Sequence, residues 1–298
     1  MMQWPRFADS PLYLGCPVWA CADWRGSLYT REASRDDYLP QYASVFNAVE
    51  GNSTFYALPA PAVVARWARE LPAGFHLCVK FPSALTHRAE LVGVERECTA
   101  FLELLRPLQN ALGPLLLQLG PAFGPARLPV LANFLGRMSR EFPVAVELRH
   151  PEFFVAGAAE TELLRILRGE GVDRVIFDTR SLHAAPSSDE STAEAQARKP
   201  QLPIREDLSG RRPMLRLVLR NEAAAAQPYL AEWAPRIARW LAAGHSPQVF
   251  VHTPDDRHAP SLARELHRLI RAQMPALPAL NPFPGESEAP PSTQLALF

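Results

Sequence analysis

Short apolar runs of β-strand type alternate along this chain with segments long enough to form helices. Eight such runs can be read, at Leu12–Gly15, Phe46–Glu50, Phe75–Lys80, Leu115–Gln118, Val144–Glu147, Val175–Asp178, Met214–Val218 and Gln248–His252. The segments between them place apolar residues at helical spacing, as in Val64, Trp67 and Leu71. Eight strand–helix units in a chain of 298 residues predict an α/β protein, a single (β/α)8 TIM-like barrel.

Most of these runs end in a residue that is able to do chemistry. At or just past their ends stand Glu50 with Asn52, Lys80, Gln118, Glu147 with Arg149, Asp178, Arg216 with Arg220, and His252 with Asp255. Barrels of this kind carry their active sites at the C-terminal ends of the strands. The chain is therefore predicted to gather its ionisable groups at one mouth of the barrel, which favours an enzyme without defining its reaction.

Two segments depart from the alternation. Residues 181–212, after the sixth run, are polar and rich in Ser and Pro, and long insertions of this composition are either lids or disordered segments. Pro275–Ser292 is rich in Pro, Gly, Ser and Glu, which is typical of a linker. We therefore predict a barrel over residues 10–273 with an insertion after strand 6, at 181–212, and a flexible tail over 274–298.

Composition restricts the cellular setting of the protein. Basic and acidic residues balance at 31 each, so no global field draws the chain to nucleic acid or membrane. The four cysteines include no C-x-x-C pair, which favours reduced structural thiols. No stretch approaches the roughly 20 apolar residues needed to span a bilayer, and residues 1–10 lack the apolar core of a signal peptide. We expect a cytoplasmic protein without a membrane partner.

Three carboxylates that end strand runs are the first catalytic candidates. Glu50, Glu147 and Asp178 would meet at the barrel mouth, and such a trio suits divalent-metal binding or paired acid–base hydrolysis. Because two or more well-placed histidines are missing beside them, neither a metal site nor a cofactor is predicted. The alternative for Glu50 is a buried structural carboxylate held by hydrogen bonds from Asn52 and Thr54.

Lys80 and His87 are further catalytic candidates. A lysine at a strand end beside carboxylates can be a permanent cation, an oxyanion stabiliser or a Schiff-base nucleophile. The alternative is a salt bridge to Glu50 or Glu147. His87 can carry a proton because imidazole titrates near neutrality, although a lone loop histidine is often simply exposed.

Several polar and aromatic residues near the strand ends are candidates for binding substrate. Glu147 and Arg149 lie two residues apart, so they share one side of their strand and can pair or jointly hold an anion. The predicted substrate-binding residues are Trp19, Asn52, Thr54, Tyr56, Gln118, Arg149, Arg216, His252 and Asp255.

Several blocks of this sequence, in the right order, resemble a known family. They are Leu14–Trp19 with Trp24–Tyr29, Val49–Pro59, Phe75–Lys80 with Thr86 and His87, Leu115–Leu119 with Pro121, and Val146–Pro151. They are similar to the YecE-like family, domain of unknown function 72, strongly over residues 12–180 and weakly over 214–272. The resemblance implies a TIM-like barrel. It implies no reaction, because the activity of the family is undefined.

The chain departs from the pattern of that family in its C-terminal half. Many members have an Arg-Leu-His-Gly block on the seventh strand, whereas this chain has Val218 at the histidine position. Members also commonly have two asparagines after the eighth strand, where this chain has His252-Thr-Pro-Asp-Asp256. Either this half of the site is remodelled, with His252, Asp255, Asp256 and His258 replacing the lost groups, or the activity is altered.

The last five residues carry a second resemblance. The pentapeptide Gln294, Leu295, Ala296, Leu297 and Phe298 looks like the motif by which bacterial polymerases and repair proteins bind the replication sliding clamp. In that motif a Gln reaches polar groups and a spaced Leu and Phe fill an apolar pocket. The alternative is a hydrophobic tail that folds back onto the barrel.

These observations lead to two hypotheses of function. The first is an enzyme, hydrolytic or lyase-like, that acts on an anionic substrate bearing a phosphate or derived from nucleic acid. Glu50 and Glu147 would be its acid and base, Lys80 and Arg149 would bind the anion, and His87 would be an auxiliary proton carrier. The second is a non-catalytic accessory protein of replication or repair that the sliding clamp recruits.

Overall fold

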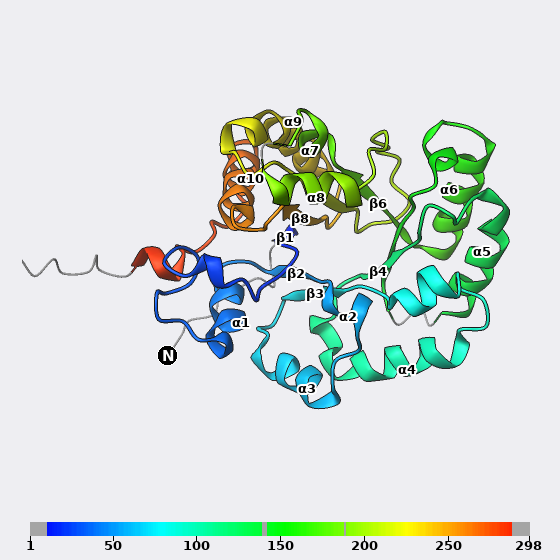
Figure 1. Cartoon of the computed structure of the whole chain (residues 1–298), viewed down its shortest axis with the longest axis horizontal. Helices are drawn as coiled ribbons and strands as arrows, with labels where there is room; N and C mark the ends of the chain where they lie inside the picture. Colours follow the sequence, from blue (N-terminus) through cyan, green and yellow to red (C-terminus); the bar gives the residue numbers. More distant parts are fainter. Residues whose placement is uncertain (1–10, 139–141, 188, 288–298) are drawn as a thin grey trace, which may run out of the picture.

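A computed structural model of the chain describes residues 11–138, 142–187 and 189–287. Figure 1 shows the strands at the centre of the molecule, with helices arranged around them. The strands are β1 (Tyr13–Gly15), β2 (Ala48–Gly51), β3 (His76–Val79), β4 (Leu115–Gln118), β5 (Val144–Glu147), β6 (Asp173–Asp178), β7 (Met214–Val218) and β8 (Gln248–His252). Each predicted run overlaps one of these strands, and four of the runs have the same bounds as the strand.

The strands form two parallel sheets. The larger, curved sheet has the order β1-β8-β7-β6-β5-β4, and the smaller sheet pairs β2 with β3. The continuous eight-stranded ladder that the sequence predicts is therefore not present in the described residues. An α/β protein with parallel strands is confirmed, but the fully closed barrel is not.

Between β1 and β2, side chains take the place of a strand ladder. The Tyr42 hydroxyl accepts a hydrogen bond from Cys16 N at 2.7 Å and donates one to Ala48 O at 2.9 Å. Asn47 bonds Leu14 N and Leu12 O, each at 2.8 Å. A Cβ atom at Gly15 would lie 1.8 Å from Ala48 O, so this close approach requires glycine. Only at the strand ends does a direct backbone bond, from Glu50 N to Cys16 O, join the two segments.

Between β3 and β4, isolated bridges join the two sheets. Lys80 pairs with Leu116 and Leu77 pairs with Leu112, both in the parallel sense. Backbone hydrogen bonds from Phe81 N to Leu116 O at 3.0 Å and from Gly113 N to Leu77 O at 3.1 Å complete this contact. The carboxyl ends of β3 and β4 consequently lie next to each other, with Lys80 at the junction.

Helices pack their apolar faces around the strands. They are α1 (Arg35–Ala43), α2 (Ser53–Tyr56), α3 (Pro61–Glu70), α4 (Glu95–Leu105), α5 (Leu128–Arg137), α6 (Ala158–Glu170), α7 (Arg180–His183), α8 (Glu190–Arg198), α9 (Ala223–Ala242) and α10 (Ala259–Gln273). The short 3-10 helices are η2 (Ala22–Trp24), η4 (Arg106–Ala111), η5 (Pro125–Arg127), η6 (Pro151–Phe154) and η7 (Pro284–Ser287), and η3 (Ala84–Arg88) is a π-helix. No helix in the described part of the chain is long and apolar enough to cross a membrane.

The predicted insertion at 181–212 is folded where the structure describes it. It contains the end of α7 and all of α8, which Gln196 ties to α7 by donating to Leu182 O at 2.8 Å. Further along, Arg205 bonds Glu160 at 2.7 Å and Ser209 donates to Val172 O at 2.8 Å. The described part of this insertion is therefore a folded segment rather than a disordered one.

The predicted flexible tail is wrong over residues 274–287. Leu277 and Phe283 are buried in the core, and the Phe283 ring lies 6.2 Å from that of Phe46. Arg264 of α10 stacks on Phe283 at 3.9 Å and forms a bidentate ion pair with Glu286. Composition suggested a linker because the segment is rich in Pro, but its buried Leu277 and Phe283 pack it against the rest of the fold.

Candidate active site

One residue from each of seven strands forms a layer on the inner side of the two sheets. The buried cluster consists of Ala48, Cys78, Leu116, Ala145, Val175, Met214 and Phe250, and Tyr13 of β1 packs against it. Side chains two positions further along a strand point to the same side. The next layer toward the carboxyl ends is therefore Gly15, Glu50, Lys80, Gln118, Glu147, Phe177, Arg216 and His252. A polar layer thus lies on an apolar one.

Arg216 is the centre of the polar layer. Its Nε and Nη2 donate to the two oxygens of Glu50, both at 2.7 Å, and its Nη1 donates to Glu147 at 2.5 Å. Arg149 donates to the other oxygen of Glu147 at 2.8 Å and to Gln118 at 3.1 Å. Burial by itself would raise the carboxyl pKa values. Arg216 acts against it together with Arg149 and Lys80 at Glu147, and together with His252 at Glu50. The pKa of Glu147 therefore falls to about 2, and that of Glu50 lies well below its ordinary value.

Asp178 does not join Glu50 and Glu147. It lies three positions after the layer residue Val175, so it points to the helix side of β6. There it accepts hydrogen bonds from Arg180 at 2.8 Å and from Trp233 Nε1 at 2.7 Å. The predicted three-carboxylate cluster is therefore wrong, and Asp178 anchors α7 and α9. No cluster of three or more His, Cys, Asp or Glu residues suited to a metal ion occurs among the described residues.

Lys80 directly follows β3 and does not form the salt bridge to Glu50 or Glu147 that was the alternative to a functional role. It is 7% exposed, and its Nζ lies 4.0 Å from the centroid of the Phe55 ring, with no ion pair or hydrogen bond within the described residues. Burial and then Arg216 lower the pKa of Lys80 from 10.5 to about 7, while Glu147 and Glu50 oppose the shift. A substantial fraction of Lys80 side chains is thus neutral at pH 7.

His87 lies on the π-helix η3, a rare conformation that is frequent at functional sites. Its Nδ1 is 2.8 Å from the Thr86 hydroxyl, and its Nε2 is 3.4 Å from Gln118 Nε2. Burial and the neighbouring Lys80 lower the pKa of His87, so its imidazole is neutral at pH 7. His87, a predicted catalytic residue, therefore lines the same pocket as Lys80, and its ring is neutral.

The end of β8 supplies three further groups. Burial lowers the pKa of His252 to about 4, and its Nε2 lies 3.3 Å from Glu50 but outside hydrogen-bond geometry. Thr253 Oγ1 is likewise buried without a hydrogen-bond partner in the described chain. Burial raises the pKa of Asp256 to about 7, although Lys199 opposes the shift. Asp256 rather than the predicted Asp255 faces the site, because Asp255 is exposed and accepts a hydrogen bond from Arg257 N.

These side chains line a pocket of about 530 Å³, which we call the strand-end pocket. Its walls also include Phe55, Phe177 and residues of the insertion helix α8, which gives the pocket a cover. Lys199 directly follows α8, and its backbone carbonyl oxygen lies 2.9 Å from His183 Nε2. Burial lowers the pKa of the Lys199 side chain. The volume suits a small molecule.

The other predicted binding residues divide between the pocket and the scaffold. Asn52 and Tyr56 line the pocket, and Tyr56 is 82% exposed at its rim. Thr54 is buried and donates to Lys80 O at 2.6 Å, so it positions β3 rather than a ligand. Trp19 packs edge-on against Trp67 at 5.4 Å and does not line the pocket.

Val218 has an apolar environment at the position where the family pattern has histidine. It packs with Phe177, Leu182 and Ala195, which belong to β6, α7 and α8. A histidine there would place a polar ring against α8. Val218 therefore fits the apolar contact by which α8 packs onto β6 and β7. This favours a remodelled active site over the loss of activity.

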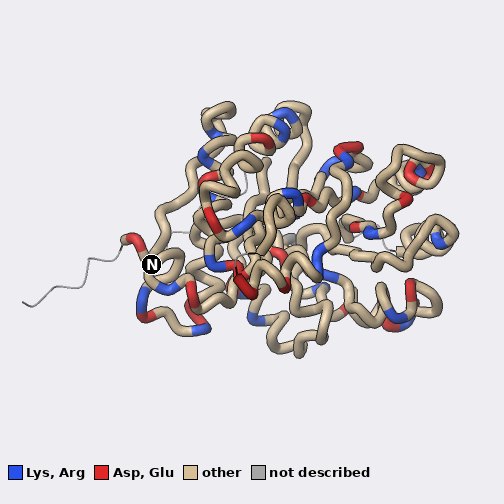
Figure 2. The backbone as a smooth tube through the Cα atoms, turned by 45° about the horizontal axis from the view of Figure 1, so that its top comes forward, with Lys and Arg blue, Asp and Glu red and all other residues tan. Residues whose placement is uncertain are grey.

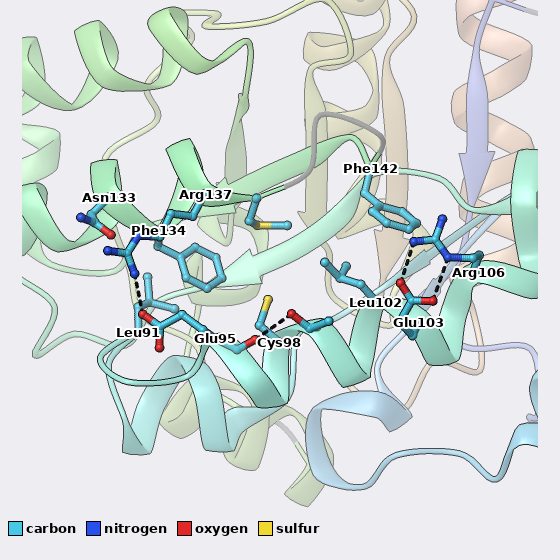
Figure 3. Close-up of a pocket in the computed structure, with 12 residues that line it drawn as sticks. Leu91, Glu95, Cys98, Leu102, Glu103, Arg106, Asn133, Phe134, Arg137 and Phe142 are labelled. Carbon is cyan, nitrogen blue, oxygen red and sulfur yellow. Dashed lines mark hydrogen bonds and ion pairs between the residues drawn. The ribbon is translucent and has the colours of Figure 1, made fainter.

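A second pocket lies away from the strand ends, along α4 and α5 (Figure 3). It measures about 250 Å³, and its charged side chains are paired with each other, Arg137 with Glu95 at 2.8 Å and Arg106 with Glu103 at 2.7 Å. Burial raises the pKa of Cys98 in its wall to about 11, so the thiol is unreactive at pH 7. The chemistry of the molecule is therefore concentrated at the strand ends.

Parallel strands with intervening helices, and a polar pocket at the carboxyl ends of those strands, define a TIM-like α/β protein with one candidate active site. The chain belongs to the family described as "Protein of unknown function DUF72", whose profile matches residues 13–288. This confirms the family that the sequence blocks indicated.

Relatives in the family are similar over almost their whole length. Proteins named UPF0759 protein YecE from two strains of Escherichia coli are 37% and 36% identical over 276 residues, which cover 93% of this chain and 98% of theirs. A crystal structure of a DUF72 family protein from Enterococcus faecalis has a TM-score of 0.65 at 17% identity, covering 87% of this chain and 95% of that chain. One from Thermotoga maritima has a TM-score of 0.62 at 20% identity, covering 87% and 99%.

Proposed function

We propose that this protein is an enzyme that binds a small anionic molecule in the strand-end pocket and transfers protons to or from it. The observation that carries the proposal is a pair of buried polar atoms that line this pocket without a hydrogen-bond partner in the described residues, His252 Nε2 and Thr253 Oγ1. Lys80, a buried residue that lines the same pocket, forms no ion pair or hydrogen bond through its Nζ within the described chain. Buried polar groups in native proteins are nearly always paired. Buried polar atoms that lack partners at one pocket therefore support the binding of a polar ligand there.

The charges of the pocket favour an anion. Its lining cations, Lys80, Arg149, Arg198, Lys199 and Arg216, outnumber its lining acids, Glu194 and Asp256. The arginines are already paired with carboxylates, so the lysines are the charges left to meet a ligand. Elsewhere basic and acidic positions are mixed along the chain, as Figure 2 shows, so selectivity for an anion arises locally.

The protonation states revise the catalytic roles that the sequence suggested. Glu50 and Glu147 are ionised at pH 7, and both hold Arg216, so they serve as fixed counter-charges rather than as acid and base. Lys80 and Asp256 have pKa values of about 7 and line the same pocket. General acid–base catalysis is most efficient with groups that titrate near the working pH. We assign the base to Lys80 and the acid to Asp256.

We also infer that the two sheets act together as one barrel of the TIM type. The inner layer takes a residue from each of β2 to β8, with Tyr13 of β1 packed against it, which is the arrangement of a barrel interior. The hydrogen bonds at the two junctions, through Tyr42 and at Phe81, support a barrel whose ladder is interrupted twice. A hydrolytic or lyase-like reaction at its mouth fits this architecture.

A binding and activity screen tests the proposal. Small carboxylates and phosphate monoesters, each with a neutral analogue, are titrated into the protein by calorimetry. Anions should bind, neutral analogues should not, and Lys199→Gln should weaken binding at least tenfold, whereas exposed Arg96→Gln should not. Equal binding of charged and neutral compounds would refute the anion site.

Asp255 and Asp256 offer a matched pair of variants for any substrate that is turned over. Loss of a general acid typically costs about 100-fold or more in rate. We expect that cost for Asp256→Asn and nearly normal turnover for Asp255→Asn, because only Asp256 lines the pocket. Equal rates in the two variants would remove Asp256 from the mechanism.

The accessory role in replication or repair remains an alternative proposal. Its support is the sequence of the last five residues, and Gln294, Leu295, Leu297 and Phe298 lie outside the residues that the structure describes. It does not exclude an enzyme, because the tail and the strand-end pocket are separate parts of the chain.

A further inference from the structure

The chain uses lysine in only two places. Of its 31 basic residues, 29 are arginine, and the lysines are Lys80 and Lys199. Both line the strand-end pocket, from two segments that are far apart in sequence. Arginine supplies positive charge as well as lysine does, but only lysine has a primary amine that can lose its proton. A chain that otherwise uses arginine, and keeps lysine at one pocket, indicates that an amine is needed there.

Of the two amines, Lys80 has the surroundings of a nucleophile. It is rigidly placed, because Thr54 bonds its carbonyl and its backbone joins β3 to β4. Its Nζ has no ion pair or hydrogen bond within the described residues, so no carboxylate has to be displaced before it reacts. Burial and the adjacent Arg216 favour the neutral amine, with a pKa of about 7. Lysines are activated in this way by apolar surroundings and a neighbouring cation.

Resting on the anion pocket proposed above, we propose that Lys80 forms a Schiff base with a small carbonyl compound that carries a carboxylate or a phosphate. The lone pair of the neutral Nζ attacks the carbonyl carbon, and the carbonyl π electrons move to its oxygen, which takes up a proton. Nζ releases one proton, giving a neutral carbinolamine. Protonation of the hydroxyl and departure of water then leave the iminium cation. The sum consumes one proton and releases one water.

The neighbours of Lys80 suit each stage of this reaction. Asp256 lines the same pocket and can hand a proton to the departing hydroxyl. Glu147 and Glu50 interact favourably with positive charge at Lys80, so they stabilise the iminium as they do the ammonium. Lys199 lines the pocket as the cation left for the carboxylate or phosphate of the substrate. Residues of α8, in the insertion, line the same pocket on its outer side.

Reductive trapping tests the proposal on the intact wild-type protein. Glyoxylate, an anion with an aldehyde, is added with cyanoborohydride, which reduces an imine to a stable secondary amine. Peptide mass mapping then assigns the label among the primary amines of the chain: Lys80, Lys199 and the N-terminus. Lys80 should be labelled at least tenfold faster than Lys199, with a rate that rises up to about pH 7 and then levels. The variant Lys80→Arg keeps the charge and should lose that label.

Two comparisons separate this proposal from the anion pocket itself. Glycolate has the same charge as glyoxylate but no carbonyl, so it should bind and protect Lys80 from labelling. Binding of glycolate without selective labelling of Lys80 would overturn the Schiff base and leave the anion pocket standing. Selective labelling that glycolate does not slow, and that neutral acetaldehyde matches, would retain the reactive lysine and overturn the anion pocket. A labelling rate that keeps rising through pH 9 would show an ordinary lysine and also overturn the Schiff base.

Discussion

At the scale of single residues, the ion pairs of Arg216 make a prediction about stability. Glu50 is fully buried and gives both of its oxygens to Arg216. Glu50→Gln should lower the free energy of unfolding by about 3 kcal/mol, because it leaves a buried guanidinium short of a counter-charge. The control is Glu162→Gln, which removes an exposed partner of Arg165 and should cost less than about 1 kcal/mol. Urea unfolding measures both, and equal costs would contradict the buried network.

Lys80 makes a prediction about pH. Its pKa is about 7 in the folded chain and 10.5 ordinarily, so below pH 7 both folded and unfolded chains carry the proton, and folding buries a charge. Between pH 7 and 10.5 the folded chain holds fewer protons than the unfolded chain, so stability rises with pH. Lys80→Met should therefore be more stable than wild type below pH 7, by a margin that shrinks as pH rises. A margin independent of pH from 6 to 9.5 would show that the lysine titrates normally.

The sequence revealed site residues only where the side of the strand on which a residue lies could be inferred from the alternation. Glu50, Lys80 and Glu147 were found because they end buried runs, and Arg216 because it interrupts one. The alternation of side chains places all four on one face. Asp178 ends its run too but is one position out of phase, and only the register of β6 with its neighbours reveals this. Lys199 was missed because its segment has no strand signal, although its being one of two lysines was visible in the composition.

At the scale of elements, the apolar contact of α8 with β6 and β7 is predicted to hold this helix over the pocket. Ala195 is the buried residue of α8 that packs against Phe177 and Val218, whereas Ala193 on the same helix is exposed. Ala195→Glu should detach the helix, because a carboxylate cannot be buried in that apolar contact without a partner. Amide hydrogen exchange over residues 190–198 should then accelerate, while Ala193→Glu should exchange like wild type. Identical exchange in both variants would mean that this contact does not hold the helix.

The elements themselves were predictable to different degrees. Fully buried strands such as β4 and β5 read as apolar runs that end in a polar residue, so their bounds could be taken from the sequence. The helix α8 has few apolar residues and relies on an Asp189 cap and on Gln196, which periodicity does not detect. The interruptions of the ladder depend on hydrogen bonds from Tyr42 and Asn47, which only the folded chain brings together.

At the scale of the whole molecule, residues 274–287 are predicted to be part of the folded unit. A chain ending at Met274 would lose buried Leu277 and Phe283 and expose the surfaces that they cover. Each buried side chain of this size contributes about 1.5–3 kcal/mol, so unfolding should become easier by roughly 3 kcal/mol or more. A chain ending at Ser287 keeps these contacts and should be more stable than the chain ending at Met274. If both truncations were equally stable, the packed segment would have no role in the fold.

The last prediction concerns the pentapeptide that ends the sequence. If Gln294–Phe298 binds a sliding clamp as an extended peptide, Leu297 and Phe298 are its apolar anchors and Gln294 fixes its register. Recognition of this kind concentrates energy in few residues, so Phe298→Ala should cost roughly 2 kcal/mol, about 30-fold in Kd. The measurement is binding of the full chain to a purified bacterial clamp, beside Leu297→Ala with Phe298→Ala and, as a matched control, Thr293→Ala. The strand-end pocket should be unaffected in each variant. Equal clamp affinity for all these chains would refute the motif and leave no support for a role at the replication fork.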